Sequence, residues 1–347
     1  MNSRQLVRHA LAGLPAPRVP TGPLAVHFCA SLAGVSLRDY TLDAAVLADC
    51  VVRYYEAFRP DAIWLSADTW VTAEALGAAV AFPDENQPLA GAGHPLIESP
   101  EQLDSLPPPD PHRLGRQPLM IDALRRIRRA VGEGVFLVAC FDQYPFSLAC
   151  ALLGMNEAMT ASLTRPGLVE AVMSRAAAHV IAYADALADA GADMLSGGDA
   201  PAGLLGPALY RRLALPFEQE VIAGIRARGK LPVSLHICGN ATPILPDMAA
   251  SGADVLELDH RTDLTRAARL VGPDIALWGN LDPVGLLTGG TPTTVATHAR
   301  QLVESMQSAG QRRFILSSGC TIAPGTPPAN LKAMLDASAP SPPPARV

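Results

Sequence analysis

The sequence is poor in aromatic residues and cysteine, and it has no long uninterrupted apolar run. Aromatic side chains make up 5% of the 347 residues although 49% are hydrophobic, so Ala, Leu and Val dominate. That mixture favours helices packed on buried aliphatic strands over an all-β sandwich. Six cysteines are too few for a small disulfide-stapled scaffold. No apolar run reaches the roughly 18 residues of a membrane span, and the first residues lack a signal-peptide core, so we expect a cytoplasmic protein that binds no membrane.

Positive charge is also in short supply. The formal net charge is −6, and only two of the 27 basic residues are lysines, Lys230 and Lys332. The arginines are scattered along the chain, and their densest cluster, at residues 125–130, fits the solvated face of an amphipathic helix. A surface of this kind does not suit a polyanion, so nucleic acid is not expected among the partners.

Short apolar runs recur along the chain with helical patterns or turn residues between them. Continuous apolar strands that alternate with helices are typical of a parallel sheet covered on both faces. Eight such runs predict a single closed (β/α)8 barrel of the α/β class, which suits a chain of this length. The predicted strands cover residues 24–29, 62–67, 135–140, 193–198, 232–237, 254–259, 275–280 and 313–318.

The rest of the pattern predicts the domain organisation. Residues 1–20 are expected to form an N-terminal helical extension, and residues 21–336 the barrel, with a homodimer left open. The Pro-, Gly- and acid-rich residues 68–120 predict an inserted segment that is part lid and part subunit contact. The Pro-rich residues 337–347 are expected to be disordered. Apolar positions spaced by three and four predict helices over residues 42–58, 167–190 and 293–309.

Polar residues follow the predicted strands at their carboxyl ends, where a barrel places its active site. His236 and Cys238 end the fifth strand, and Cys320 follows the eighth. Because all these strand ends face one mouth, the three side chains can converge. One imidazole and two thiolates form a tetrahedral zinc set with one open position, and sulfur ligands favour zinc over magnesium or calcium. The alternative is a buried cysteine that stands by chance beside an unrelated histidine.

Other polar residues at the strand ends are further candidates for the site. Asp199 is expected to point into the cavity as a substrate-orienting or acid–base group, with a rim carboxylate bonded to backbone amides as the alternative. Asn240 and His260 complete the candidate catalytic set. The candidates for contacting a bound cofactor, with structural roles at the rim as the alternative, are Asp68, Asp142 and Asn280.

Four motifs carry a family resemblance: "LHICGNATPILPDMAASGAD", "LWGNLDP", "GTPTTV" and "FILSSGCTIAPGTPPANLKAM". Together they resemble the uroporphyrinogen decarboxylase superfamily, and within it the zinc-dependent branch typified by methylcobamide:coenzyme M methyltransferase. The resemblance is strongest over residues 185–335. It implies zinc ligands at His236, Cys238 and Cys320 in a (β/α)8 barrel. It also implies transfer of a methyl group from a methylcobamide to a small-molecule thiol or a pterin.

Two departures from the family pattern leave alternatives open. That branch has an acidic, displaceable fourth zinc ligand where this sequence has His260, beside Asp259. True uroporphyrinogen decarboxylases carry an arginine-rich stretch that grips substrate carboxylates, whereas this chain reads "CASLAGVSLRDYTLD". A metal-using decarboxylase or lyase is the second interpretation, and a non-catalytic partner that binds a corrinoid or tetrapyrrole the third. No D-x-H-x-x-G corrinoid motif is present, so a cobamide must arrive free or on a separate corrinoid protein.

Overall fold

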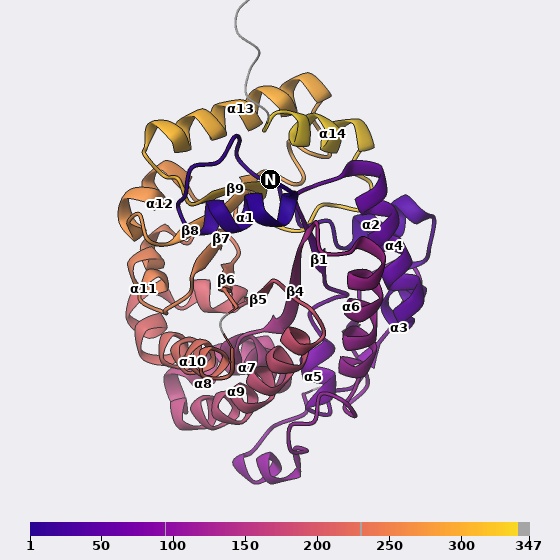
Figure 1. Ribbon diagram of the computed structural model, residues 1–347. Helices are drawn as coiled ribbons and strands as arrows, with labels where there is room; N and C mark the ends of the chain where they lie inside the picture. The colour runs from indigo at the N-terminus through magenta and orange to yellow at the C-terminus, as the bar shows by residue number, and fades with distance from the viewer. Residues whose placement is uncertain (94, 230, 339–347) are drawn as a thin grey trace, which may run out of the picture.

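The structure, a computed structural model, describes residues 1–93, 95–229 and 231–338. Seven parallel strands form one curled sheet in the order β1-β4-β5-β6-β7-β8-β9, with helices around the outside (Figure 1). This arrangement confirms the predicted α/β barrel class. The strands are β1 (Ala62–Leu65), β4 (Phe136–Gln143), β5 (Met194–Gly198), β6 (Val233–Ile237), β7 (Val255–Leu258), β8 (Ala276–Leu281) and β9 (Phe314–Ser318).

The barrel closes between β9 and β1 through a short extended segment, residues 20–22. The Gly22 N–H donates to the Leu316 carbonyl at 3.0 Å, and the Ala62 N–H donates to the Thr21 carbonyl at 3.0 Å. The segment therefore bonds to both edge strands and takes the eighth place in the barrel wall. No sheet edge of the barrel is left open at this seam.

The predicted strand over residues 24–29 is wrong, because those residues lie after the closing segment and turn into a helix. Pro20 and Pro23 lack amide hydrogens, so the closing segment cannot extend into a longer ladder. Helix α2 (His27–Ala33) begins within the predicted strand and buries Phe28 and its neighbours on its inner face. A short apolar run fits a buried helix as well as a buried strand. Here the two prolines end the extended segment, and the residues after them form a helix.

The helices predicted over residues 42–58, 167–190 and 293–309 are confirmed as α4, α9 and α13. Helix α4 begins after Asp43, whose carboxylate accepts the N–H groups of Ala45 and Val46. The helices are α1 (Ser3–Leu11), α2, α3 (Leu37–Leu42), α4 (Ala44–Phe58), α5 (Val71–Ala75), α6 (Gln117–Val131), α7 (Pro145–Leu153), α8 (Met155–Thr164), α9 (Pro166–Asp189), α10 (Gly206–Arg228), α11 (Leu245–Ala249), α12 (Leu264–Val271), α13 (Pro292–Ser308) and α14 (Pro328–Asp336), with 3-10 turns η1 (Pro100–Ser105), η2 (Ala200–Leu204) and η3 (Thr242–Ile244).

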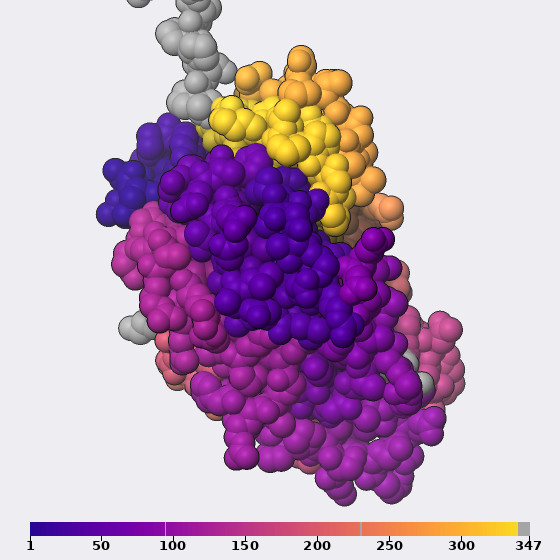
Figure 2. All heavy atoms as spheres, turned by 90° about the vertical axis from the view of Figure 1, so that its right-hand side faces the viewer, coloured from indigo at the N-terminus to yellow at the C-terminus, as the bar shows by residue number. Residues whose placement is uncertain are grey.

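Two separate apolar cores hold the barrel together. The larger core lies between the strands and the surrounding helices. The smaller core fills the barrel interior, where Trp64 and Trp278 meet edge to face with ring centres 5.6 Å apart. Helix α1 adds Val7 and Ala10 to this interior core and so plugs the end of the barrel where the strands begin. Figure 2 shows the N-terminal (indigo) and C-terminal (yellow) parts of the chain packed against each other on one face.

The predicted insertion, residues 68–120, connects β1 to α6. Its described part contains α5, the 3-10 turn η1 and a two-stranded antiparallel pair, β2 (Val80–Ala81) and β3 (Leu89–Ala90). Its role as a lid or subunit contact stays a prediction. Residues 339–347 of the predicted disordered tail lie outside the described residues. No single helix in the described chain is long and apolar enough to cross a membrane, although α7 and α8 pass that test as a pair bent by 111°.

Candidate metal centre

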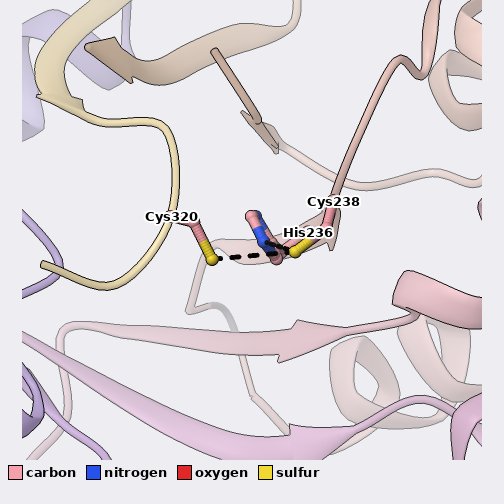
Figure 3. A group of neighbouring side chains, drawn as sticks. All are labelled: His236, Cys238 and Cys320. Atoms are coloured by element: carbon pink, nitrogen blue, oxygen red, sulfur yellow. Dashed lines mark hydrogen bonds between the residues drawn. The ribbon is translucent and has the colours of Figure 1, made fainter. Parts of the chain in front are cut away.

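Three side chains meet at the mouth of the barrel, where the strands end. His236 lies in β6, Cys238 follows that strand directly, and Cys320 comes two residues after β9 (Figure 3). In β6 the residues alternate, so that Leu235 and Ile237 pack in the outer core while the side chain of His236 turns to the interior. The predicted convergence of strands five and eight is thus present in the structure.

The separations within this group suit a zinc ion. Two sulfurs bound to one zinc at about 2.3 Å in tetrahedral geometry lie about 3.8 Å apart. The Sγ atoms of Cys238 and Cys320 are 3.7 Å apart. The Nε2 atom of His236 lies 2.9 Å from the Cys238 sulfur, and the three ligand atoms are all within 4.8 Å of one another. Ligands bound to one zinc would have a nitrogen–sulfur separation of about 3.5 Å, so the His236 ring needs to move only slightly away from the Cys238 sulfur to accept the metal.

A hydrogen bond on the side of the ring away from the thiols fixes the orientation of His236. Its Nδ1 atom lies 3.1 Å from the backbone carbonyl of Glu257 in the neighbouring strand β7, and a carbonyl can only accept. In the neutral ring, which is the form that binds a metal, Nδ1 therefore carries the proton and the Nε2 lone pair faces the two thiols. Metal-binding histidines are held in this way by an outer partner, which selects the tautomer and increases the basicity of the ligand.

A buried polar layer lies directly beneath the metal centre. The Glu257 carboxylate accepts hydrogen bonds from Ser196 Oγ, at 2.8 Å, and from Ser234 Oγ, and its Oε2 atom lies 3.9 Å from His236 Nδ1. Burial raises the pKa of Glu257 above its ordinary value. Neither serine was among the site residues predicted from the sequence. The signal was available, since Ser234 lies two residues before His236 on the same inward face of a strand.

The electrostatics of the group favour a thiolate. The hydrogen bond from Cys238 lowers the pKa of Cys320, and the imidazole of His236 lowers it further. The same hydrogen bond, followed by burial, raises the pKa of Cys238. Burial alone would lower the pKa of His236, but the hydrogen bond and charge of Cys320 together with the charge and carbonyl of Glu257 outweigh burial and raise that pKa to about 9. The surroundings of Cys320 therefore favour the thiolate, which is the form of cysteine that binds a metal.

His260 lies beside the three ligands but outside their group. Its Nδ1 atom is 3.0 Å from Asp259 Oδ1, and its Nε2 atom is 3.8 Å from Asp282 Oδ2, so two carboxylates flank the ring. Its backbone lies against Gly319, where an added Cβ would be 2.4 Å from the His260 nitrogen. The predicted role of His260 as a displaceable fourth ligand stays a prediction.

The sequence matches the uroporphyrinogen decarboxylase (URO-D) family over residues 2–339. The chain belongs to this family. A uroporphyrinogen decarboxylase from Aromatoleum aromaticum is 31% identical over 309 residues, which cover 87% of this chain and 84% of the relative.

A curated relative and a solved structure that resemble this chain carry a methyltransferase name. The methylcobamide:CoM methyltransferase MtaA from Methanosarcina barkeri is 26% identical over 335 residues, covering 94% of this chain and 95% of the relative. A solved methyltransferase from Methanosarcina mazei matches with a TM-score of 0.87 at 25% identity, over 97% of this chain and 98% of that one. The expected family is thus confirmed, and its named members are enzymes, either decarboxylases or methyltransferases.

Two further acidic candidates lie on the side of the mouth formed by β1 and β4. Asp68 accepts two hydrogen bonds from Arg116, at 2.5 and 3.1 Å, and Arg116 also donates to Glu74. Asp142 accepts the N–H of Thr72 with one oxygen, while its Oδ1 atom is buried without a hydrogen-bond partner. Burial raises the pKa of Asp142 well above its ordinary value, and the nearby Asp68 adds to this. Their role in cofactor contact stays a prediction.

The two asparagine candidates take part in the loops around the metal centre. Asn280 donates both amide hydrogens, to the carbonyls of Asp259 at 2.9 Å and Thr262 at 2.7 Å. It therefore shapes the loop that carries His260, and only its side-chain oxygen is left for a ligand. Asn240 is exposed, and its Oδ1 atom accepts the N–H of Thr242 at the start of a turn. Their predicted contacts with substrate or cofactor stay predictions.

Asp199 does not point into the cavity, which corrects the expected orientation. It is fully buried, and one carboxylate oxygen accepts the backbone N–H and the hydroxyl of Ser147 in α7. Its other oxygen, Oδ2, is buried without a hydrogen-bond donor, and so is Oε1 of the nearby Glu218 in α10, whose Oε2 atom accepts from Tyr210. The alternative interpretation, a rim carboxylate bonded to a backbone amide, describes it better. The side chain of Asp199 turns toward the surrounding helices, because Ser147 in α7 supplies its hydrogen-bond donors.

Proposed function

We propose that this chain is a zinc-dependent methyltransferase that moves a methyl group from a methylcobamide to a thiol or pterin acceptor. The observation that carries the proposal is the group of His236, Cys238 and Cys320, whose sulfurs lie 3.7 Å apart at the barrel mouth. The similarity to a methylcobamide:CoM methyltransferase over 94% of the chain supports it. A decarboxylase would have no evident need for two thiolates and an imidazole at this position.

The chain's own residues can bind and prepare the site. Zinc held by His236, Cys238 and Cys320 would lower the pKa of an incoming thiol and position its sulfur, with the fourth position open to it. The Glu257 carbonyl keeps His236 in the tautomer that offers Nε2. His260, between two carboxylates, is the candidate to accept the proton that the thiol gives up. A methylcobamide, free or on a separate corrinoid protein, would approach across the same mouth.

A second candidate function is decarboxylation, which the 31% identity to a uroporphyrinogen decarboxylase favours. The charge at the mouth opposes it, because a polycarboxylate substrate needs cations there. Arg116 is buried and already bonded to Asp68 and Glu74. Arg38, the arginine in the stretch where decarboxylases have several, is bonded to the Phe82 carbonyl. The acidic groups around the mouth would repel such a substrate.

The first experiment measures zinc in the purified protein by mass spectrometry. Wild type is expected to hold one zinc, and His236→Ala and Cys320→Ala to lose at least about 100-fold in zinc affinity, because loss of an outer partner alone costs 10–100-fold. Cys140→Ser is the matched control, since Cys140 is a part-exposed thiol outside the three-residue group. Circular dichroism of each variant shows whether the fold survives.

The second step is an activity assay of the zinc-loaded protein. Methylcobalamin is offered with a panel of thiols and a reduced pterin, and demethylation is followed by absorbance; a purified corrinoid protein replaces free cobalamin in a parallel set. Methyl transfer that needs zinc supports the proposal. Wild-type protein that is found to bind no zinc contradicts the proposal. Zinc-loaded protein that decarboxylates uroporphyrinogen and leaves methylcobalamin unchanged also contradicts it, and favours the second candidate.

A further inference from the structure

The two thiols of the metal centre are close enough to react with each other. Their Sγ atoms are 3.7 Å apart, whereas a disulfide requires about 2.05 Å, so the sulfurs must approach by about 1.7 Å. A change of that size is within the range of a rotation about one Cα–Cβ bond. Both residues lie in loops at the mouth, within two residues of the ends of their strands, and are partly exposed, so an oxidant can reach them from solvent.

The other cysteines do not share this situation. Cys29, Cys50 and Cys150 are buried, with 0–3% of their surface exposed. Cys140 is partly exposed, but its sulfur faces the carbonyl of Asp142 and burial raises its pKa. Among the described residues, Cys238 and Cys320 form the one pair of sulfurs within hydrogen-bonding distance. Selective oxidation of this pair follows from distance and access together.

We infer that Cys238 and Cys320 form a reversible disulfide, so that the metal centre is also an oxidation site. With a peroxide as oxidant, one thiolate attacks an oxygen, a sulfur–oxygen bond forms, the oxygen–oxygen bond breaks and hydroxide leaves. The second thiolate then attacks the sulfenic sulfur, the disulfide forms, and the sulfur–oxygen bond breaks with release of a second hydroxide; the two hydroxides take up the two protons that the thiols lost and become water. Two thiols and one hydrogen peroxide give one disulfide and two waters, and two electrons pass from sulfur to the peroxide.

The disulfide and the metal exclude each other. Its formation removes both thiolate ligands and leaves His236, which cannot hold zinc alone. Oxidation therefore releases the metal, and reduction restores the site. The inference goes beyond the proposed methyl transfer, because disulfide formation depends on the thiols and not on the substrate. A peroxide would switch the enzyme off without unfolding it.

The experiment treats zinc-loaded and zinc-free full-length protein with one equivalent of hydrogen peroxide. The expected product has lost the mass of two hydrogen atoms, and digestion yields one cross-linked peptide that joins Cys238 to Cys320. In the zinc-loaded sample a chromogenic chelator is expected to record about one zinc released for each disulfide formed. A phosphine reductant then restores the mass and, after added zinc, the metal content.

Matched variants decide the outcome. Cys140→Ser is expected to behave as wild type, whereas Cys238→Ser is expected to stop at sulfenic or higher acids on Cys320 with no cross-link. Peroxide that adds oxygen to wild type without joining the two peptides overturns the inference, and so does a cross-link that forms only in urea. A chain that binds no zinc but still forms the disulfide would contradict the proposed function and leave this inference standing.

Discussion

At the residue scale, Glu257 links the metal centre to the buried serines beneath it. Its carboxylate accepts hydrogen bonds from Ser196 and Ser234 and lies near the ring of His236. We expect Glu257→Gln to weaken zinc binding about 10-fold, because outer-shell partners of a metal-binding histidine contribute that much. The carboxylate lies 3.9 Å from Nδ1, and an amide would replace its charge with a weaker dipole. Competition with a fluorescent zinc chelator measures the effect.

The matched control for Glu257 is Asp274→Asn, because the side chain of Asp274 is 91% exposed and lies away from the metal centre. Its zinc affinity should equal that of wild type. Equal affinity in Glu257→Gln as well would show that the backbone carbonyl alone orients His236.

A second residue-scale prediction concerns the pair of buried carboxyl groups, Asp199 and Glu218. Burial raises the pKa of Asp199 to about 6, and burial and the charge of Asp199 raise that of Glu218. Both folded-state values are above those of the unfolded chain, so the stabilisation is complete below about pH 4 and is lost as pH rises through about 6. Urea unfolding at pH 5 and pH 8 measures the loss.

Glu218→Gln should reduce this pH dependence, because its amide can donate to Asp199 at every pH and one of the two charges is gone. Glu220→Gln, an exposed position on the same helix, is the control and should keep the wild-type dependence. Identical pH profiles for Glu218→Gln and wild type would mean that the pair does not share a proton.

The sequence could predict the metal ligands but not the direction of every rim carboxylate. His236, Cys238 and Cys320 were predictable because thiolate and imidazole at strand ends have few other uses. Asp199 follows its strand in the same way, yet its side chain turns to the helix layer. That turn depends on the donors of Ser147 and the carboxyl of Glu218, residues about 50 and 20 positions away in the sequence.

At the element scale, the position of Cys320 depends on how closely the loop after β9 packs on the loop after β7. A Cβ at Gly319 would lie 2.4 Å from the His260 nitrogen and 3.1 Å from the Asp259 carbonyl carbon, and backbone atoms cannot move aside cheaply. Gly319→Ala is therefore expected to destabilise the fold by about 1–3 kcal/mol and to reduce zinc affinity by displacing Cys320. Thermal unfolding and zinc titration measure the two effects.

The same loop offers a matched control in Gly325. An added Cβ there meets no atom within 4 Å, and its backbone is not in the left-handed region. Gly325→Ala should change stability by less than about 0.5 kcal/mol and leave zinc affinity intact. If Gly319→Ala behaves in the same way, the contact between the two loops does not set the position of Cys320.

Elements were predictable where a periodic pattern was long. Helices α4, α9 and α13 have 15, 24 and 17 residues, and their apolar spacing repeats over several turns. The six-residue run at 24–29 gave no such repetition, and the seam that replaces it rests on a few backbone bonds, two with Leu316 and one each with Asp61 and Ala62. Bonds between segments so distant in sequence leave no local pattern to find.

At the scale of the whole molecule, one end of the barrel carries the candidate metal centre and the other carries a buried cluster of ion pairs. The metal centre lies where the strands end, and the opposite end is held by the Asp193 carboxylate at the start of β5. Asp193 accepts from Arg4 at 2.6 Å, from Arg8 at 3.0 Å and from Arg128 at 2.6 Å, and its side chain has no exposed surface. These bonds tie helix α1 onto the base of the barrel. Function and stability are expected to separate along this axis.

Asp193→Asn tests that separation. Removing the charge leaves guanidinium groups without their buried partner, so we expect a loss of about 3 kcal/mol in the free energy of unfolding. Zinc affinity should stay at the wild-type value, because the metal centre lies at the other end of the strands. Asp185→Asn, which breaks a surface pair with Arg228, should cost at most about 1 kcal/mol. A drop in zinc affinity in Asp193→Asn would show instead that strain at the base of the barrel reaches the mouth through the strands.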